Sequence, residues 1–206
     1  MSTDGIINTI VFDIGRVLIG FEWDEYVSSL FEPEVAKRVT TATFGSEYWK
    51  ELDRGVMSME DIIQSFIDID PEMTAEILEA VDRVGECTTH QDYAIPWIEE
   101  LQERGYNVLY LSNYSEHVRN ASTHALDFIP SMNGGIFSCD IQCIKPDEKI
   151  YMELFDTYGL KPEECVFIDD TPANIEAAKK LGMKGIVFEN YEQAHAELDQ
   201  LLASHV

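Results

Sequence analysis

The chain has 206 residues, and its 39 acidic against 14 basic side chains give a formal net charge of −25 at pH 7. Such a surplus of negative charge argues against the phosphate backbone of a nucleic acid as the main partner, although local donors and a metal ion can still attract a small anion. Hydrophobic residues make up 45% of the chain, which is enough for the core of one domain, or of one domain with an insertion.

The N-terminal residues 1–8 contain no basic region followed by a long apolar one, so they do not resemble a signal peptide. No apolar stretch approaches the roughly 20 residues of a membrane span. The four cysteines form no CxxC pair, and free thiols are typical of a reducing compartment. We therefore expect a cytoplasmic protein without a membrane partner.

The first predicted strand covers residues 6–12 and ends at a carboxylate, Asp13. Its apolar run Ile10-Val11-Phe12 is typical of a strand that is buried on both faces of a parallel sheet. Ligands of such sheets bind outside the carboxyl ends of the strands, which is where Asp13 would lie. A carboxylate held there can bind a hard cation, attack an electrophile or only begin a turn.

Residues 22–88 have a different pattern, in which apolar side chains recur at helical rather than strand spacing. Ser58, with Asp61 three residues later, resembles a capping box at the start of one helix. The segment therefore predicts a small helical bundle that follows the first strand. Its predicted helices cover residues 24–31, 33–43, 46–54, 58–68 and 74–84.

From about residue 90 the chain alternates between strand and helix patterns. The predicted strands cover 106–111, 135–138, 164–168 and 184–188, and the predicted helices cover 94–104, 115–126, 147–158, 172–181 and 191–203. Alternation of this kind is typical of a mostly parallel sheet with crossover helices. We therefore predict an α/β fold, with a Rossmann-like parallel sheet core and an inserted α-helical cap domain.

Polar side chains follow several of these strands, at the point where each strand ends. Because the carboxyl ends of parallel strands share one edge of the sheet, we expect these side chains to gather there. Together they supply three carboxylates, a hydroxyl, an amide and an ammonium, which suit a divalent cation and a phosphoryl group. They are Asp13, Ser112, Asn113, Lys145, Asp169 and Asp170.

Four motifs in this order resemble those of the haloacid dehalogenase (HAD) superfamily, and the resemblance covers the whole chain. They are Phe12-Asp13-x-Gly15-x-Val17-Leu18, Leu111-Ser112-Asn113, Lys145-Pro146-Asp147-x-x-Ile150-Tyr151, and Phe167-Ile168-Asp169-Asp170 followed by Asn174-Ile175. The helical segment resembles the type 1 cap of this family. The resemblance thus implies a core domain of residues 1–17 and 91–206 and a cap domain of residues 18–90.

A narrower resemblance comes from the Asp-x-Gly-x-Val form of the first motif and from the phrase Arg54-Gly55-Val56-Met57-Ser58. Both are similar to the group of bacterial sugar-phosphate phosphatases related to α-D-glucose-1-phosphate phosphatase.

The family resemblance implies a catalytic nucleophile and a metal site. Asp13 is expected to form an aspartyl-phosphate that water then hydrolyses, which splits one hard displacement into two easier ones. Mg²⁺ is expected to bind a carboxylate oxygen of Asp13, the backbone carbonyl of Gly15 and the carboxylate of Asp170. Asp169 is expected to bind it through water or to orient the ligands. Such a sparse set suits Mg²⁺, which keeps several waters.

The resemblance also implies how the phosphoryl group is bound. The hydroxyl of Ser112 and the backbone N–H of Asn113 are expected to donate hydrogen bonds to its oxygens. Lys145 is expected to be catalytic as well as substrate-binding, because its charge would also offset the clustered carboxylates.

The chain departs from the family pattern at Gly15, where the phosphatases usually carry a second aspartate. That aspartate protonates the leaving oxygen and later activates water, and general acid–base help is typically worth about 10²–10⁴ in rate. Its loss implies a slow enzyme, one limited to better leaving groups, or a substitute side chain. Glu22 and Asp24 are candidates for the substitute, and solvated positions beside the cap are the alternative. Arg16, where glycine is common, either reaches the substrate or forms an outward-facing salt bridge.

We therefore predict a Mg²⁺-dependent phosphatase that acts on a small phosphorylated metabolite, such as a sugar phosphate. One alternative is a metal-free 2-haloacid dehalogenase, which also uses the aspartate of the first motif. The other is a binding protein that keeps the fold without turnover, because fold does not fix function. The oligomeric state is not indicated by the sequence.

Overall fold

The computed structural model describes residues 6–203 and is built on a five-stranded parallel sheet. The strands lie in the order β5-β4-β1-β6-β7, so β1 occupies the centre. In this register Val11 of β1 lies opposite Leu109 of β4 and Phe167 of β6. The strands are β1 (Thr9–Phe12), β4 (Asn107–Ser112), β5 (Gly134–Phe137), β6 (Cys165–Asp169) and β7 (Lys184–Val187).

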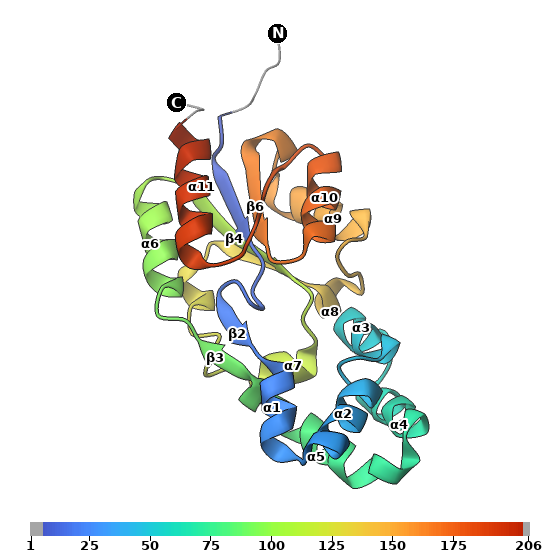
Figure 1. Ribbon diagram of the computed structural model, residues 1–206. Helices are drawn as coiled ribbons and strands as arrows, with labels where there is room; N and C mark the ends of the chain where they lie inside the picture. The colour runs from blue at the N-terminus through green and yellow to red at the C-terminus, as the bar shows by residue number, and fades with distance from the viewer. Residues whose placement is uncertain (1–5, 204–206) are drawn as a thin grey trace.

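Helices cover both faces of the sheet, because successive side chains of a strand point to opposite faces. Ile10 and Phe12 belong to the apolar cluster shared with α6 and α11, whereas Val11 belongs to the cluster shared with α9 and α10. Figure 1 shows the first pair of helices on one side of the sheet and the second pair on the other. The four helices are α6 (Ala94–Glu103), α9 (Glu148–Tyr158), α10 (Pro172–Lys180) and α11 (Tyr191–Ala203).

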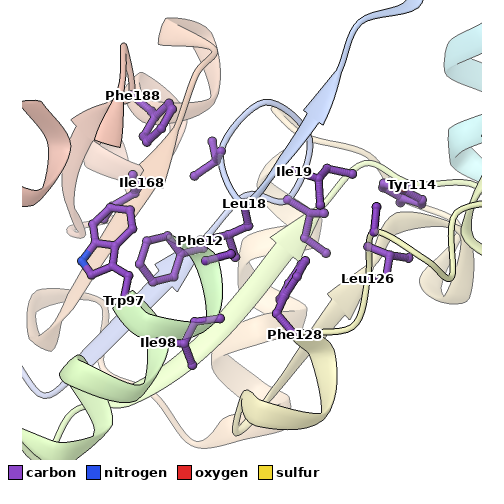
Figure 2. Packing of buried hydrophobic residues seen from close by; sticks show 14 of the residues in the cluster. Phe12, Leu18, Ile19, Trp97, Ile98, Tyr114, Leu126, Phe128, Ile168 and Phe188 are labelled. Atoms are coloured by element: carbon purple, nitrogen blue, oxygen red, sulfur yellow. The ribbon is translucent and has the colours of Figure 1, made fainter. Parts of the chain in front are cut away.

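The larger cluster forms around an aromatic pair beneath the central strand. The ring of Trp97 on α6 meets that of Phe12 edge-on, with 4.7 Å between the ring centroids. Figure 2 shows these rings beside Ile168 of β6, with Leu18 and Phe128 continuing the cluster. Since Phe12 is fully buried, the strand that ends at Asp13 is anchored by packing on both faces.

A helical insertion (residues 22–87) separates β1 from the rest of the sheet and has an apolar cluster of its own. Its fully buried residues include Ile62 and Phe66 of α4, at helical spacing. Ser58 caps α4, since its Oγ accepts a hydrogen bond of 3.1 Å from the backbone N of Asp61, as the sequence predicts. The helices are α1 (Trp23–Leu30), α2 (Pro33–Ala42), α3 (Glu47–Arg54), α4 (Met59–Ile69) and α5 (Thr74–Asp82).

The insertion leaves and rejoins the core through a ribbon of two short strands that the sequence analysis misses. β2 (Ile19–Phe21) and β3 (Thr88–His90) pair antiparallel and lie side by side between the sheet and α1 in Figure 1. Three residues are too few to show the alternation by which a strand is recognised. Thr88 alone of this ribbon lies within the segment 22–88 that is predicted to be helical, so the predicted helices stand and the ribbon is an addition to them.

The chain beyond β4 also differs in detail from the prediction. α7 (Glu116–Ala121) is shorter than the predicted helix over 115–126, because Ser122 and Thr123 are poor residues for a helix interior. The chain turns there and carries Leu126 and Phe128 into the core. The remaining short helices are α8 (Ser138–Ile141) and the 3₁₀ turns Pro71–Met73, Val84–Cys87, Ile129–Ser131 and Pro162–Glu164.

The predicted fold class is confirmed, since a parallel sheet with flanking helices carries a separate group of helices. The domain limits at residues 17, 18, 90 and 91 stay a prediction. Within residues 6–203, no helix combines the length and the apolar character needed to cross a bilayer.

The central position of β1 predicts a large loss of stability when its core is truncated. Ile10→Ala removes a fully buried side chain and should lower the free energy of unfolding by about 2–5 kcal/mol, measured by urea denaturation. Ile6→Ala is the matched control, since Ile6 is 75% exposed, and it should change stability by less than about 0.5 kcal/mol. Equal effects of the two substitutions would contradict this account of the core.

Candidate active site

The carboxyl edge of the sheet brings together the side chains that the sequence places at strand ends. Asp13 directly follows β1, and its backbone N–H donates a 2.8 Å hydrogen bond to the carbonyl of Ile168 on β6. Ser112 is the last residue of β4, and Asp169 is the last residue of β6. Lys145 reaches the same place from the segment between α8 and α9.

Asp13 is held by three donors that converge on one of its oxygens. Oδ1 accepts hydrogen bonds from the backbone N of Ile14 at 2.7 Å and from the hydroxyl of Ser112 at 2.7 Å. The ammonium of Lys145 lies 2.8 Å from the same atom. Within residues 6–203, the other oxygen, Oδ2, accepts no hydrogen bond, so it is the oxygen available to a metal ion or an electrophile.

Lys145 is almost entirely buried and uses its ammonium to bridge the site. Besides Asp13, its Nζ contacts Oδ2 of Asp169 at 2.7 Å and the carbonyl of Leu111 at 2.9 Å. Burial alone would lower the pKa of Lys145, but the charges of Asp13 and Asp169 outweigh it and raise that pKa. Lys145 is therefore a fixed cation with all three of its donors in use.

Asp169 is fully buried and fully hydrogen-bonded. Its Oδ1 accepts from the backbone N of Thr171 at 2.7 Å, and the amide of Asn174 lies 3.1 and 3.0 Å from its two oxygens. With Lys145 added, few lone pairs stay free for a metal ion. The arrangement suits a carboxylate that orients its neighbours.

The side chain of Asn113 fixes the backbone around Lys145. Its Oδ1 accepts from the backbone N of Lys145 at 2.8 Å, and its Nδ2 donates to the carbonyl of the same residue at 3.1 Å. This reciprocal pair of bonds sets where the lysine enters the site. The amide of Asn113 is expected at this edge of the sheet, but its pairing with the backbone of Lys145 is not predicted from the sequence.

Asp170 completes a group of carboxylates that can hold a cation. One ligand oxygen from each of Asp13, Asp169 and Asp170 lies within 4.8 Å of the other two. Asp170 is half-buried, and its carboxylate accepts one hydrogen bond, of 3.2 Å, from the hydroxyl of Thr171. Burial and then the charge of Asp169 raise the pKa of Asp170. A hard divalent cation, which prefers oxygen ligands, fits this donor set.

Burial also dominates the electrostatics of Asp13. It raises the pKa of Asp13 to about 7, although the charge of Lys145 opposes the shift. The nearby charge of Asp169 adds to the increase. A cation between these carboxylates would therefore favour the ionised form of Asp13.

A tight turn follows Asp13 and determines what the next residues can do. Arg16 has a left-handed backbone, with φ of 60°, and its exposed side chain donates from Nε to the carbonyl of Phe21 at 3.3 Å. The side chain of Arg16 is thus exposed, and among the described residues it hydrogen-bonds to a carbonyl rather than forming the salt bridge that was one of the two expected arrangements. Glu22 and Asp24 are also exposed, and neither lines the cavity beside Gly15.

That cavity, called the Gly15 cavity below, has a volume of about 90 Å³. Its lining residues include Gly15, Trp49, Asp53, Asn113 and Tyr114. Trp49 and Asp53 come from α3, so the helical insertion forms part of the wall of the site. A space of this size holds a few water molecules, so it suits a group about as large as phosphate.

Asp53 is a residue that the sequence analysis misses. It is half-buried at the end of α3, and burial followed by the charge of Asp13 raises its pKa to about 7. The available signal is its place directly before the phrase Arg54-Gly55, which the resemblance includes. Nothing in the local sequence shows that a carboxylate of the insertion lies beside the sheet edge.

Comparison with known proteins agrees with this geometry. A family model described as haloacid dehalogenase-like hydrolase matches residues 7–182. The chain belongs to this family.

The HAD hydrolase is similar to flavin mononucleotide hydrolase 1 of Arabidopsis thaliana, with 26% identity over 153 residues. The match covers 74% of this chain and 61% of that relative, so the chain spans less than two thirds of its length. A sesquiterpene phosphatase from Aspergillus oryzae is 24% identical over 196 residues, which cover 93% of this chain and 95% of that protein.

Among solved structures, a HAD family enzyme from Bacteroides thetaiotaomicron in complex with magnesium and inorganic phosphate has a TM-score of 0.71. The two chains are 18% identical, and the alignment covers 91% of the HAD hydrolase and 98% of that enzyme. This likeness establishes the fold. The predicted membership of the superfamily is thus confirmed, while the narrower resemblance to glucose-1-phosphate phosphatases stays a prediction.

The buried ammonium of the HAD hydrolase predicts a strong effect of its removal. Lys145→Met should lower the free energy of unfolding by about 3–5 kcal/mol, because two buried carboxylates lose their counter-charge. Chemical denaturation measures the loss, and Lys149→Met, at an exposed position of α9, is the control. Added Mg²⁺ should recover more stability in the variant than in the wild type, since a cation replaces the missing charge. A variant as stable as the control would refute this view of Lys145.

Proposed function

We propose that the HAD hydrolase is a Mg²⁺-dependent phosphatase that hydrolyses a small phosphorylated metabolite through an aspartyl-phosphate on Asp13. The observation that carries the proposal is the carboxylate group at the sheet edge. Asp13 keeps one oxygen free of hydrogen bonds, and it lies within 4.8 Å of ligand oxygens of Asp169 and Asp170.

In the proposed reaction, Oδ2 of Asp13 attacks phosphorus while the bond to the leaving oxygen breaks. Its partner oxygen is fixed by Ser112 and Lys145, so the attacking atom is already oriented before substrate binds. Water then hydrolyses the aspartyl-phosphate and regenerates the carboxylate. This arrangement supports the assignment of Asp13 as nucleophile.

Mg²⁺ would be held by Asp13, by Asp170 and by the backbone carbonyl of Gly15, with Asp169 behind them. Asp170, with its single hydrogen bond, has the free oxygen that a ligand needs, while the saturated Asp169 suits the orienting role. When bound, the ion supplies positive charge that lets two anions approach each other.

Two groups on the core would bind the phosphoryl oxygens. The backbone N–H of Asn113 would donate to one of them, and the hydroxyl of Ser112, which donates its single proton to Asp13 in this structure, would turn to another. Lys145 would donate one N–H to the phosphoryl group as it approaches. The N–H that is bonded to the carbonyl of Leu111 is the one free to change partner, because that contact is not an ion pair. The ammonium would then be catalytic through its field.

The relatives that are named as a flavin mononucleotide hydrolase and a sesquiterpene phosphatase support this class of reaction. The small Gly15 cavity supports a small substrate, such as a sugar phosphate. The metal-free dehalogenase and the inactive binding protein are less well supported. Neither of these two functions requires three carboxylates that lie close enough together to bind a metal ion, as Asp13, Asp169 and Asp170 do. A cytoplasmic location stays a prediction.

Variants at the sheet edge test the proposal. Wild type should release phosphate from an aryl phosphate or from a member of a sugar phosphate panel only with Mg²⁺, and EDTA should stop the release. Asp13→Asn should be inactive because it lacks the nucleophilic carboxylate. Asp170→Asn should bind Mg²⁺ about 10–100-fold more weakly by calorimetry, a range typical for groups around a metal.

The control for both is Asp156→Asn, an exposed carboxylate on α9, which should behave as wild type. Release of halide from a 2-haloacid that persists in EDTA would favour the dehalogenase instead. Mg²⁺ binding without turnover on any phosphate ester would favour the binding protein.

A further inference from the structure

Gly15 has no side chain that could act as the acid of the proposed reaction, although a side chain would fit at this position. A Cβ atom built on Gly15 would meet no heavy atom within 4 Å, so the space beside the nucleophile is open. Gly15 also lines the Gly15 cavity, which places this open space where a leaving group would depart. A proton donor for the leaving oxygen must therefore come from another wall of the same cavity.

Asp53 stands on that other wall. It lines the Gly15 cavity together with Gly15 and Asn113, although 38 positions of chain and most of three helices separate it from Gly15. Within the described chain, the cavity lining contains no second carboxylate. The earlier candidates Glu22 and Asp24 are exposed at the start of α1.

The core holds the end of α3 firmly enough to keep this carboxyl in place. The buried hydroxyl of Ser138 donates to the carbonyl of Asp53 at 2.5 Å and accepts from the backbone N of Tyr114 at 2.9 Å. It thereby links α3 to the segment that follows Asn113. Gly55 then ends α3 with φ of 71°, and an added Cβ there would lie 2.9 Å from Cys139 of α8. Only glycine allows so close an approach.

The electrostatic setting of Asp53 agrees with a proton-transfer role. Burial and then the charge of Asp13 raise the pKa of Asp53 to about 7, while Lys145 and the backbone of Ser115 act in the opposite direction. A general acid works best when its pKa lies near the operating pH. An ordinary surface aspartate would be ionised at that pH and have no proton to give.

We propose that Asp53 of the helical insertion is the general acid and base of this phosphatase, in place of the carboxylate that Gly15 lacks. The proposal rests on the proposed function. It assigns to the insertion a catalytic group that the family pattern places on the core.

The proposed reaction has two steps. In the first, Asp13 forms a bond to phosphorus, the bond from phosphorus to the leaving oxygen breaks, and that oxygen takes the electron pair. The proton of the Asp53 carboxyl passes to the same oxygen, so the product leaves as an alcohol. In the second, the Asp53 carboxylate takes a proton from water as the water oxygen bonds to phosphorus. The pair of the broken phosphorus–oxygen bond then returns to Asp13.

Asp53→Asn tests the role through the leaving group. With an alkyl phosphate, whose leaving oxygen needs a proton, the variant should lose about 10²–10⁴ in kcat. With p-nitrophenyl phosphate the leaving oxygen needs little protonation. The variant should then be slow mainly in the second step, the hydrolysis of the aspartyl-phosphate. The variant should then accumulate a phosphoenzyme, detected by intact mass after acid quenching, which wild type and Asp13→Asn do not show.

Three further variants keep the test specific. Asp53→Glu retains a carboxyl and should keep more activity than Asp53→Asn, whereas Glu60→Gln, at an exposed position of α4, should match wild type. Gly15→Asp fits the open space and should restore at least about tenfold of the rate lost in Asp53→Asn. Mg²⁺ affinity and melting temperature should stay unchanged in Asp53→Asn, which separates a chemical role from a structural one.

Some outcomes would overturn the proposal. Asp53 would be a substrate-binding residue if Asp53→Asn lowers the rate with both substrates by the same factor, mainly through KM, and no phosphoenzyme accumulates. If Gly15→Asp alone is as fast as wild type but the double variant Gly15→Asp/Asp53→Asn is as slow as Asp53→Asn, then a carboxyl at position 15 does not replace that of Asp53. If wild type releases no phosphate, the proposed function fails as well. If wild type is active and Asp53→Asn matches it, only the role of Asp53 fails.

Discussion

The arrangement of the site depends on the ammonium of Lys145, which lies between two carboxylates below the protein surface. Asp13 and Asp169 would repel each other across a buried space without a cation to join them. The same ammonium anchors to a carbonyl of β4, so one charge connects three strands of the sheet. Before a metal binds, one ammonium faces the three carboxylates of Asp13, Asp169 and Asp170, so the site has more acidic than basic groups, as does the chain, with its net charge of −25. A divalent cation would be needed to make the pocket attractive to a phosphate dianion.

The proposed chemistry is divided between the strand ends of the sheet and the helical insertion. The nucleophile and the carboxylates for the cation lie on strand ends packed from both faces, which gives them fixed positions. The acid that we propose, Asp53, comes from α3 and lines a cavity of about 90 Å³ beside the sheet edge. The full set of groups therefore depends on the contact between α3 and the core at Ser138. A cap that covers a site in this way also keeps bulk water away from the reaction.

Much of this architecture follows from the sequence, and the reasons are physical. Asp13, Ser112 and Asp169 could be placed because parallel strands bring their ends to one edge. The hydrogen bond between the Asn113 side chain and Lys145 could not, since it joins two loops that no periodic pattern positions. Asp53 was missed for a related reason. Its role depends on how α3 sits on the core, through Ser138, and a contact between two distant segments leaves no mark on the local sequence.

The β2–β3 ribbon has a consequence for protein engineering. The backbone N–H of Glu22 donates a 2.9 Å hydrogen bond to the carbonyl of Cys87, so the two ends of the intervening segment meet. The two ends of a replacement segment would need to lie as close together as Glu22 and Cys87 do, whatever the length or fold of that segment. The replacement segment would also have to supply apolar side chains in place of Tyr26, Val27 and Val39, which belong to the same buried cluster as Phe12. Chimaeras with a foreign module spliced at this junction should therefore keep the sheet, but they would lose the carboxyl of Asp53 unless the module supplies one at the same place.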